Sequence, residues 1–245
     1  MVQLKKISSL LLLSSVIALV SCNQQKSLRS DIYTVQRHNM VRWDLKEQGI
    51  KSELVLQAMA KVPRHLFLPP EYQTQAYQDK ELPISQYLTT PPPIVVAKTI
   101  ELLNLQGFER VLEVGTGRGY QAALLSELSK EVYTIEIVPE IAKEAKEILS
   151  LLQYKNVACK LGDGYQGWPD KQPFDAIIVT ASASAVPSPL LEQLKIGGRL
   201  VMPIQAGTEQ SLVLYRKTTK GLEKESIMPV KLQPMEGKAT GRSFQ

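Results

Sequence analysis

A glycine-rich turn between an apolar run and a helical pattern constrains the fold of this chain more than any other feature. Residues 111–114 predict a buried strand, and residues 121–128 predict a helix. Between them stand Gly115, Gly117 and Gly119, which let the backbone turn tightly and let a ligand approach the main chain. The G-x-G-x-G spacing differs from the G-x-G-x-x-G of dinucleotide-binding folds. A plain turn without a ligand is the alternative interpretation.

The same alternation of strands and helices continues on both sides of the turn. Further strands are predicted at residues 132–136, 157–161, 176–179, 199–203, 212–216 and 227–232. Helices are predicted at residues 54–59, capped by Ser52 and ended by Pro63, and at residues 94–103, 141–152 and 189–194, the last ended by Gly197 and Gly198. Residues 64–93 predict an ordered loop. We therefore expect an α/β fold with a doubly wound, mostly parallel sheet, antiparallel C-terminal strands and a helical N-terminal extension.

Acidic residues follow the predicted strands at the edge where open α/β sheets bind ligands. Glu136 lies 21 residues beyond Gly115 at the end of the second strand, where a carboxylate can bind both hydroxyls of a ribose. Asp163, between Gly162 and Gly164, follows the third strand and can accept a hydrogen bond from an adenine amino group. A solvated carboxylate at Glu136 and a plain turn at Asp163 are the alternatives. Together these residues favour a nucleoside-containing ligand.

The glycine spacing is typical of folds that bind S-adenosyl-L-methionine, whose ligand has no pyrophosphate to seat on the helix. Glu113 begins the turn, where it can face the ammonium end of such a ligand. The predicted cofactor-binding residues are Glu113, Gly115, Thr116, Gly117, Gly119, Glu136, Asp163 and Gly164.

Composition argues against two other kinds of site. The formal net charge is +5, with both signs evenly mixed and no long basic run, so we expect no nucleic-acid partner. His38 and His65 are the only histidines and lie in different segments, and Cys159 is the only cysteine beyond Cys22. We therefore expect no metal site and no disulfide within the chain.

The N-terminus has the pattern of an export signal. Lys5 and Lys6 precede an apolar run, residues 7–21, that is too short for a comfortable membrane span and ends at Cys22. The tetrad at residues 19–22 resembles the bacterial lipoprotein signal, in which the cysteine is lipidated. We therefore expect a signal at residues 1–21, a tether at residues 22–30, a single domain at residues 31–245, and attachment to the cell envelope. A chance apolar N-terminus on a cytoplasmic protein is the alternative.

The chain resembles the protein-L-isoaspartate O-methyltransferases. The similar stretches are residues 58–64, 76–79, 82–84, 111–123, 156–157, 162–165, 167–169, 173–177 and 191–200. The resemblance implies a Rossmann-like methyltransferase that transfers a methyl group from S-adenosyl-L-methionine to the carboxylate of L-isoaspartyl residues. The resulting ester closes to a succinimide, which reopens partly to normal aspartate. It also implies damaged proteins and peptides as partners, and we expect a monomer.

One stretch departs from this family. After residues 82–84 the family reads Gly-x-Gly-Gln-Thr-Ile-Ser, with a serine that assists catalysis, whereas this chain places Pro91 at the serine position. Thr90 is the nearest hydroxyl and is the predicted catalytic residue. The alternative is that Thr90 caps a helix starting near Pro92. We expect residues 85–93 to form a stiff lid over the acceptor site, because three prolines restrict the backbone.

Two further functions remain open. The first is a methyltransferase of the same fold that acts on another carboxylate or on a small acceptor. A lipid-anchored binding protein that has lost catalysis belongs to a different class. An NAD-linked oxidoreductase is disfavoured by the glycine spacing.

Overall fold

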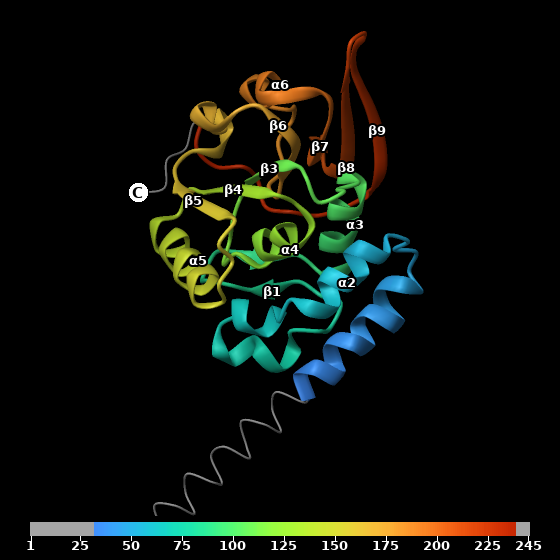
Figure 1. The fold of residues 1–245 in the computed structure, drawn as a ribbon, viewed down its shortest axis with the longest axis vertical. Coiled ribbons are helices and arrows are strands. Elements are labelled where there is room, and N and C mark those ends of the chain that lie inside the picture. The colour runs from blue at the N-terminus through green and yellow to red at the C-terminus, as the bar shows by residue number, and fades with distance from the viewer. Residues whose placement is uncertain (1–31, 239–245) are drawn as a thin grey trace, which may run out of the picture.

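A seven-stranded sheet forms the centre of the molecule (Figure 1). The structure is a computed structural model that describes residues 32–238. The predicted signal at residues 1–21, the tether at residues 22–30 and Cys22 lie outside the described residues. The strand order is β5-β4-β3-β6-β7-β8-β9. The strands are β3 (Arg110–Val114), β4 (Glu131–Glu136), β5 (Val157–Leu161), β6 (Phe174–Val179), β7 (Leu194–Ala206), β8 (Glu209–Thr218) and β9 (Gly221–Pro229).

Strands β3 to β7 are parallel, and β8 and β9 extend the sheet antiparallel to β7. The order reverses at β3, because the chain runs outward through β4 and β5 and then returns to place β6 on the other side of β3. Open α/β sheets bind ligands at such a switch point, outside the carboxyl ends of the strands. The predicted α/β sheet with antiparallel C-terminal strands is confirmed.

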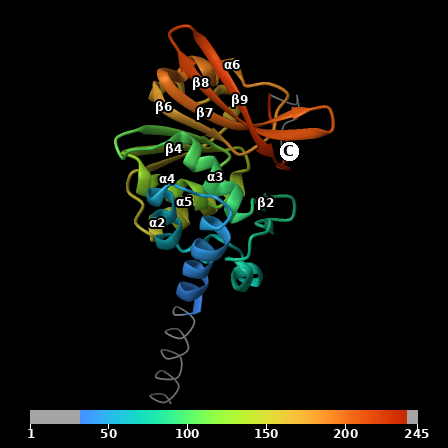
Figure 2. The same cartoon turned by 90° about the vertical axis from the view of Figure 1, so that its right-hand side faces the viewer.

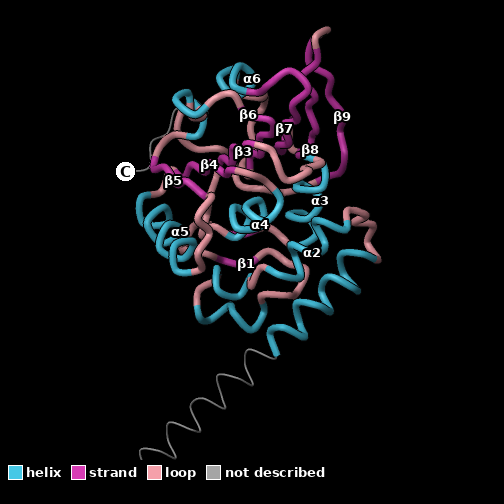
Figure 3. The backbone as a smooth tube through the Cα atoms, viewed as in Figure 1, coloured by secondary structure: helices cyan, strands magenta, loops and turns pink. Residues whose placement is uncertain are grey.

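The central strands are buried on both faces, so their side chains alternate between two cores. In β3, Val111 packs into the core that contains most helices, whereas Leu112 packs into the core on the opposite face. This burial explains why the strand reads as a continuous apolar run. Figures 2 and 3 show helices flanking the sheet. The helices are α2 (Glu53–Lys61), α3 (Pro93–Leu103), α4 (Tyr120–Leu128), α5 (Pro139–Leu151) and α6 (Ser188–Gln193).

The part of the chain before α3, residues 32–92, is the N-terminal extension. It packs on the helix-containing core of the sheet. It begins with a helix from residue 32 whose second part, Met40–Lys46, has the wider π-helical winding, and Leu45 is buried there. Ser52 caps α2 by accepting a hydrogen bond from the amide of Val55 at 3.4 Å, as predicted. Residues 64–93 are ordered but are not purely loop. They contain 3₁₀ helices at Arg64–Phe67 and Pro70–Gln75 and a two-stranded ribbon of β1 (Leu82–Pro83) and β2 (Thr89–Thr90).

Two predicted boundaries in the C-terminal half were wrong. Gly197 and Gly198 do not end α6, because β7 already begins at Leu194 and the glycines lie at a register shift between β6 and β7. The last strand was predicted at residues 227–232, but β9 runs from Gly221 to Pro229. Most of β9 is exposed, because it is the edge strand of the sheet. Its sequence therefore lacks the alternation of apolar and polar residues that predicts a strand.

After β9 the chain crosses the carboxyl ends of the strands. We call residues 230–238 the crossing segment, which passes from the β9 side toward the β5 side (Figure 1). The amide of Ser182 donates to the carbonyl oxygen of Gln233, and the amide of Met235 donates to Ser182, both at 2.8 Å. The segment therefore forms one wall over the edge of the sheet where the predicted site residues lie.

Candidate active site

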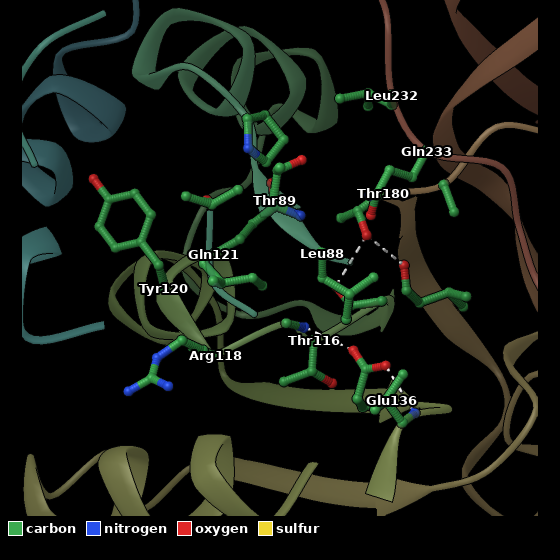
Figure 4. A pocket seen from close by; sticks show the side chains of 18 of the residues that line it. Leu88, Thr89, Thr116, Arg118, Tyr120, Gln121, Glu136, Thr180, Leu232 and Gln233 are labelled. Carbon is green, nitrogen blue, oxygen red and sulfur yellow. Dashed lines mark hydrogen bonds between the residues drawn. The ribbon is translucent and has the colours of Figure 1, made fainter. Parts of the chain in front are cut away.

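A cavity opens at the carboxyl ends of β3, β4 and β6 (Figure 4). Its walls include the turn after β3, the end of β4, the segment containing β2 and the crossing segment, with further residues from the segment after α2 and from the loops after β5 and β6. The predicted site residues that line it are Thr90, Gly115, Thr116, Gly117, Glu136 and Gly164. The fold thus brings together residues that are up to 74 positions apart in the chain, from Thr90 to Gly164.

Glu136 ends β4 and organises the floor of the cavity. One carboxylate oxygen accepts a hydrogen bond from the amide of Gly117 at 2.8 Å, and the other accepts from the amides of Ile137 at 2.9 Å and Val138 at 3.0 Å. Burial raises the pKa of Glu136, and these three amides oppose that rise. The carboxylate keeps unused acceptor positions that can receive hydroxyl groups of a bound ribose. Figure 4 shows it beside the glycine turn.

Two glycines let the backbone around the cavity pack against neighbouring side chains more closely than any larger residue could. A Cβ at Gly115 would stand 2.0 Å from Oγ1 of Thr180, and a Cβ at Gly164 would stand 2.2 Å from a methyl of Val114. Gly115 also has a φ of 94°, in the region that favours glycine. This cradle, with the Glu136 carboxylate on one side and apolar residues around it, fits the adenosyl part of S-adenosyl-L-methionine.

Glu113 does not line the cavity, contrary to the expectation that it faces the ligand. It lies in β3 with no exposed surface, and its carboxylate accepts a hydrogen bond from the Thr134 hydroxyl at 2.6 Å. That hydroxyl also bonds the hydroxyl of Thr116 at 2.6 Å. Burial raises the pKa of Glu113 to about 8. Side chains alternate between the two faces along β3, and this position faces the interior. The Glu113 side chain therefore stabilises the turn from inside the fold, through Thr134 and Thr116.

Asp163 and Gly119 also stand behind the cavity wall. Asp163 accepts hydrogen bonds from the amides of Tyr165 at 2.9 Å and Lys238 at 2.8 Å, so its carboxylate holds the 3₁₀ turn and the crossing segment. Gly119 is the N-terminal cap position of α4, with a φ of 94°. Only their neighbours reach the cavity: Gly164, Arg118 and Tyr120.

Thr90 lines the cavity from β2, and the predicted cap role is wrong. Helix α3 begins at Pro93, its cap position is Pro92, and no side chain from the preceding residues caps it. The amide of Ile94 is instead bound by the carboxylate of Asp79 at 3.0 Å. Within residues 32–238 the Thr90 hydroxyl makes no hydrogen bond, whereas the neighbouring Thr89 hydroxyl donates to Glu81.

Arg64 is a cavity residue that the sequence analysis missed. Its guanidinium is fully buried and donates to the carbonyl oxygens of Ala76 at 2.9 Å and Pro91 at 2.8 Å. It also lies over the ring of Tyr120, 5.5 Å from the centroid. Among the described residues no carboxylate forms an ion pair with it, and burial lowers its pKa. A buried cation beside Pro91 favours an anionic acceptor at this end of the cavity.

Thr180 and the crossing segment were also missed. The Thr180 hydroxyl donates toward the carbonyl oxygens of Gly115 at 2.9 Å and Val114 at 3.1 Å, which restrains the turn (Figure 4). Thr180 follows β6, so the strand-end rule that identified Glu136 would also have found it. Gln233 in the crossing segment donates to the carbonyl oxygen of Tyr87 at 2.6 Å. This contact joins two walls of the cavity that are 146 positions apart.

Neither a metal cluster nor a membrane-spanning helix occurs within residues 32–238. Across residues 32–238, no three histidine, cysteine, aspartate or glutamate side chains gather closely enough to hold a metal ion. Over the same residues, none of the helices combines the length and the apolar character that crossing a bilayer requires.

Proteins of one name match most of this chain. A protein of Gloeobacter violaceus named protein-L-isoaspartate O-methyltransferase is 46% identical over 197 residues, which cover 80% of this chain and 96% of that protein. A protein of the same name from Dictyoglomus thermophilum is 49% identical over 195 residues, covering 79% of this chain and 88% of the relative. The match thus spans nearly the whole length of the Gloeobacter protein.

Solved structures agree. A protein-L-isoaspartate O-methyltransferase superposes with a TM-score of 0.77 at 31% identity, over 83% of this chain and 67% of the other. A putative enzyme of that name from Plasmodium falciparum, in complex with S-adenosyl-L-homocysteine, superposes with a TM-score of 0.72 at 25% identity, over 82% and 98%. Residues 36–240 match the family described as protein-L-isoaspartate(D-aspartate) O-methyltransferase (PCMT). The resemblance stated from the sequence is therefore confirmed, and the chain belongs to the protein-L-isoaspartate O-methyltransferase family.

Proposed function

We propose that this chain transfers a methyl group from S-adenosyl-L-methionine to the carboxylate of L-isoaspartyl residues in damaged proteins, with Thr90 as the hydroxyl that binds the acceptor. One observation carries the assignment of Thr90. Its side chain lines the cavity and its hydroxyl has no partner within residues 32–238, whereas Pro91, at the family's serine position, has neither a hydroxyl nor a backbone donor.

The residues around the glycine turn hold the cofactor. Glu136 would bind the ribose hydroxyls, and the backbone at Gly115 and Gly117 would let the ligand lie close to the main chain. When bound, the cofactor supplies a methyl group that its sulfonium has already activated. The protein therefore contributes mainly by holding the acceptor oxygen in line with that methyl group, and such positioning supplies about 7–11 kcal/mol in favourable cases.

The acceptor end combines a hydroxyl donor with a buried cation. The Thr90 hydroxyl would donate to one oxygen of the acceptor carboxylate and leave the other oxygen free to accept the methyl group, with S-adenosyl-L-homocysteine as the other product. Arg64 anchors the carbonyl of Pro91 and places positive charge behind this wall. A hydrogen bond to a charged group contributes about 1.5–3 kcal/mol, so loss of the Thr90 hydroxyl slows transfer without abolishing it.

Transfer of an isotope-labelled methyl group to an isoaspartyl peptide tests the function. We expect transfer to the isoaspartyl peptide and none to the same peptide with normal aspartate. Thr90→Ala should lower the turnover rate while leaving cofactor affinity unchanged, and Thr218→Ala, at the end of β8 and outside the cavity, is the control. Pro91→Ser, which restores the family residue, should raise turnover or leave it unchanged.

Three results would redirect the proposal. Equal turnover in Thr90→Ala and in the wild type would remove Thr90 from the acceptor site while leaving the activity in place. Transfer to a different carboxylate or small acceptor, but not to isoaspartate, would assign another substrate to the same fold. Cofactor binding without transfer to any acceptor would favour a binding protein that has lost catalysis.

We also propose that the chain is exported, lipidated at Cys22 and active as a monomer at the cell envelope. The apolar run at residues 7–21 and the position of Cys22 support this location. Membrane fractionation of the native chain and of Cys22→Ser decides it, because only the native chain should stay with the membrane. A native chain that is soluble with an intact N-terminus would contradict the proposal. Sedimentation at several protein concentrations tests the monomer.

A further inference from the structure

The first described helix leaves an apolar face uncovered. Along residues 32–46, Met40 and Leu45 are buried against the core. On the outer side, Ile32, Val35 and Trp43 are 55%, 58% and 55% exposed, which is unusual for such large apolar side chains. The spacing of three and eight residues keeps these three side chains on one face of the helix. The helix lies at the periphery of the molecule, away from the β8–β9 hairpin (Figures 1 and 2).

Within residues 32–46 the exposed polar residues beside this stripe are neutral or cationic, and the exposed cap residue that follows, Glu47, is acidic. Seven residues between positions 32 and 46 are exposed, and we call them the outer face: Ile32, Val35, His38, Asn39, Arg42, Trp43 and Lys46. None of them is acidic. The Arg42 guanidinium lies over the Trp43 ring, 4.5 Å from the centroid. Lys46 also forms an exposed ion pair with Glu53 at 3.2 Å. Apolar and aromatic residues flanked by arginine and lysine are the composition of helices that lie in a membrane interface.

The position of this face in the chain identifies its occupant. Ile32 comes ten positions after Cys22, and ten residues of extended chain reach at most about 35 Å. We propose that the outer face of residues 32–46 rests on an anionic lipid surface, with Trp43 at the headgroup level and Arg42 against the lipid phosphates. This inference rests on the proposed attachment at Cys22 and assigns a second, independent contact with the membrane.

A second contact with the membrane would set the orientation of the domain as well as its location. A flexible tether leaves the domain free to rotate, whereas a helix lying on the surface fixes which side of the domain faces the lipid. Tryptophan suits this position because its ring is apolar and its N–H can bond at the interface.

Tryptophan fluorescence on vesicles tests the contact separately from lipidation. The chain from residue 22 with Cys22→Ser carries a hexahistidine tag at its N-terminus, which holds it on phosphatidylcholine–phosphatidylglycerol vesicles that contain a nickel-chelating lipid. Residues 1–21 can be omitted because the family match begins at residue 36. The vesicle lipids carry brominated acyl chains, which quench a tryptophan at the interface. The chain has two tryptophans, and Trp168 packs against Tyr133 on the sheet.

We expect bromolipid to quench the wild type and Trp168→Phe, and this quenching to be lost in Trp43→Phe. Arg42→Glu should reduce it, and Lys224→Glu, the same charge change on the distant strand β9, should not. Methyl transfer in solution should be the same in all four variants, which shows that the fold is intact.

Two results would overturn the inference. Trp43 that stays unquenched on the tethered vesicles would leave the outer face without a lipid contact. A concentration-dependent dimer that Trp43→Phe abolishes would assign the face to a second copy of the chain. Because the tag supplies the tether, neither result depends on whether Cys22 is lipidated in the cell, and failed lipidation would leave the quenching unaffected.

Discussion

The guanidinium of Arg64 binds the carbonyl oxygen of Pro91 over 2.8 Å. Arg64 follows α2, and Pro91 precedes α3, so one hydrogen bond joins two parts of the N-terminal extension at the wall of the cavity. The same guanidinium binds Ala76. Three segments of the extension therefore meet at a single buried side chain, which no short-range pattern in the sequence would reveal.

Arg64→Met should destabilise the protein strongly. The substitution leaves the carbonyl oxygens of Ala76 and Pro91 without this donor, and each buried unsatisfied group costs about 1–3 kcal/mol. Arg64→Lys keeps the charge and part of the bonding, so its loss should be smaller. Urea unfolding measures both, with Arg216→Met as the control, because Arg216 forms a partly exposed ion pair with Glu225. Equal losses at positions 64 and 216 would contradict this role.

Glu136→Ala should weaken cofactor binding by about 1–3 kcal/mol, the cost of removing hydrogen bonds to a charged acceptor. The lost contacts include the amide of Gly117, so the turn also loses a support. Titration calorimetry with S-adenosyl-L-homocysteine gives the affinity. Glu131→Ala, at the opposite end of β4 and outside the cavity, is the matched control. An unchanged affinity in folded Glu136→Ala would remove it from the site.

Gly115→Ala should cost more than Gly107→Ala, although both glycines have a positive φ, 94° and 99°. Each substitution incurs backbone strain of about 1–3 kcal/mol. Only at Gly115 does the new Cβ meet another atom, because Oγ1 of Thr180 would be 2.0 Å away, whereas Gly107 faces open space. The difference in unfolding free energy between the two variants isolates the clash. Adding Thr180→Ala should relieve Gly115→Ala and leave Gly107→Ala unaffected.

Because of Glu113, the free energy of unfolding should fall as the pH rises from about 5 to 8. Its pKa is raised to about 8 by burial, so the folded state keeps a proton that the unfolded chain releases near its ordinary pKa of 4.5. The folded state then binds more protons than the unfolded state, and the free energy of unfolding falls with pH in this window. Glu113→Gln is neutral at every pH and should flatten the dependence. Urea unfolding at pH 5.5 and 8 gives the pH dependence of the free energy of unfolding for the wild type and for Glu113→Gln. An equal pH dependence in the two proteins would contradict the role of Glu113.

The parts of the site that the sequence predicted depend on local signals. Gly115 and Glu136 stand at fixed offsets from strands that read clearly as apolar runs, and parallel strands bring their carboxyl ends to one edge. Glu113 was misplaced because spacing alone gives a residue's position along the strand and not the face that it occupies. For a strand buried on both faces, polarity does not distinguish one face from the other.

The parts that were missed depend on long-range contacts. Gln233 reaches Tyr87 across 146 positions, and nothing in the residues after β9 predicts where they go. The extent of β9 was missed for a different reason. Leu222 and its charged neighbours are exposed on an edge strand, where pairing with β8 and not apolar burial determines the conformation.

The crossing segment has a consequence for the order in which the protein matures. Residues 232–236 supply a wall of the cavity, yet they follow every helix and strand of the described fold in chain order. During synthesis, the sheet and its glycine turn can therefore form before the cavity is closed. A chain that crosses a membrane unfolded carries no assembled site with it, so on the proposed export route the methyl donor has to be bound where the chain finishes folding.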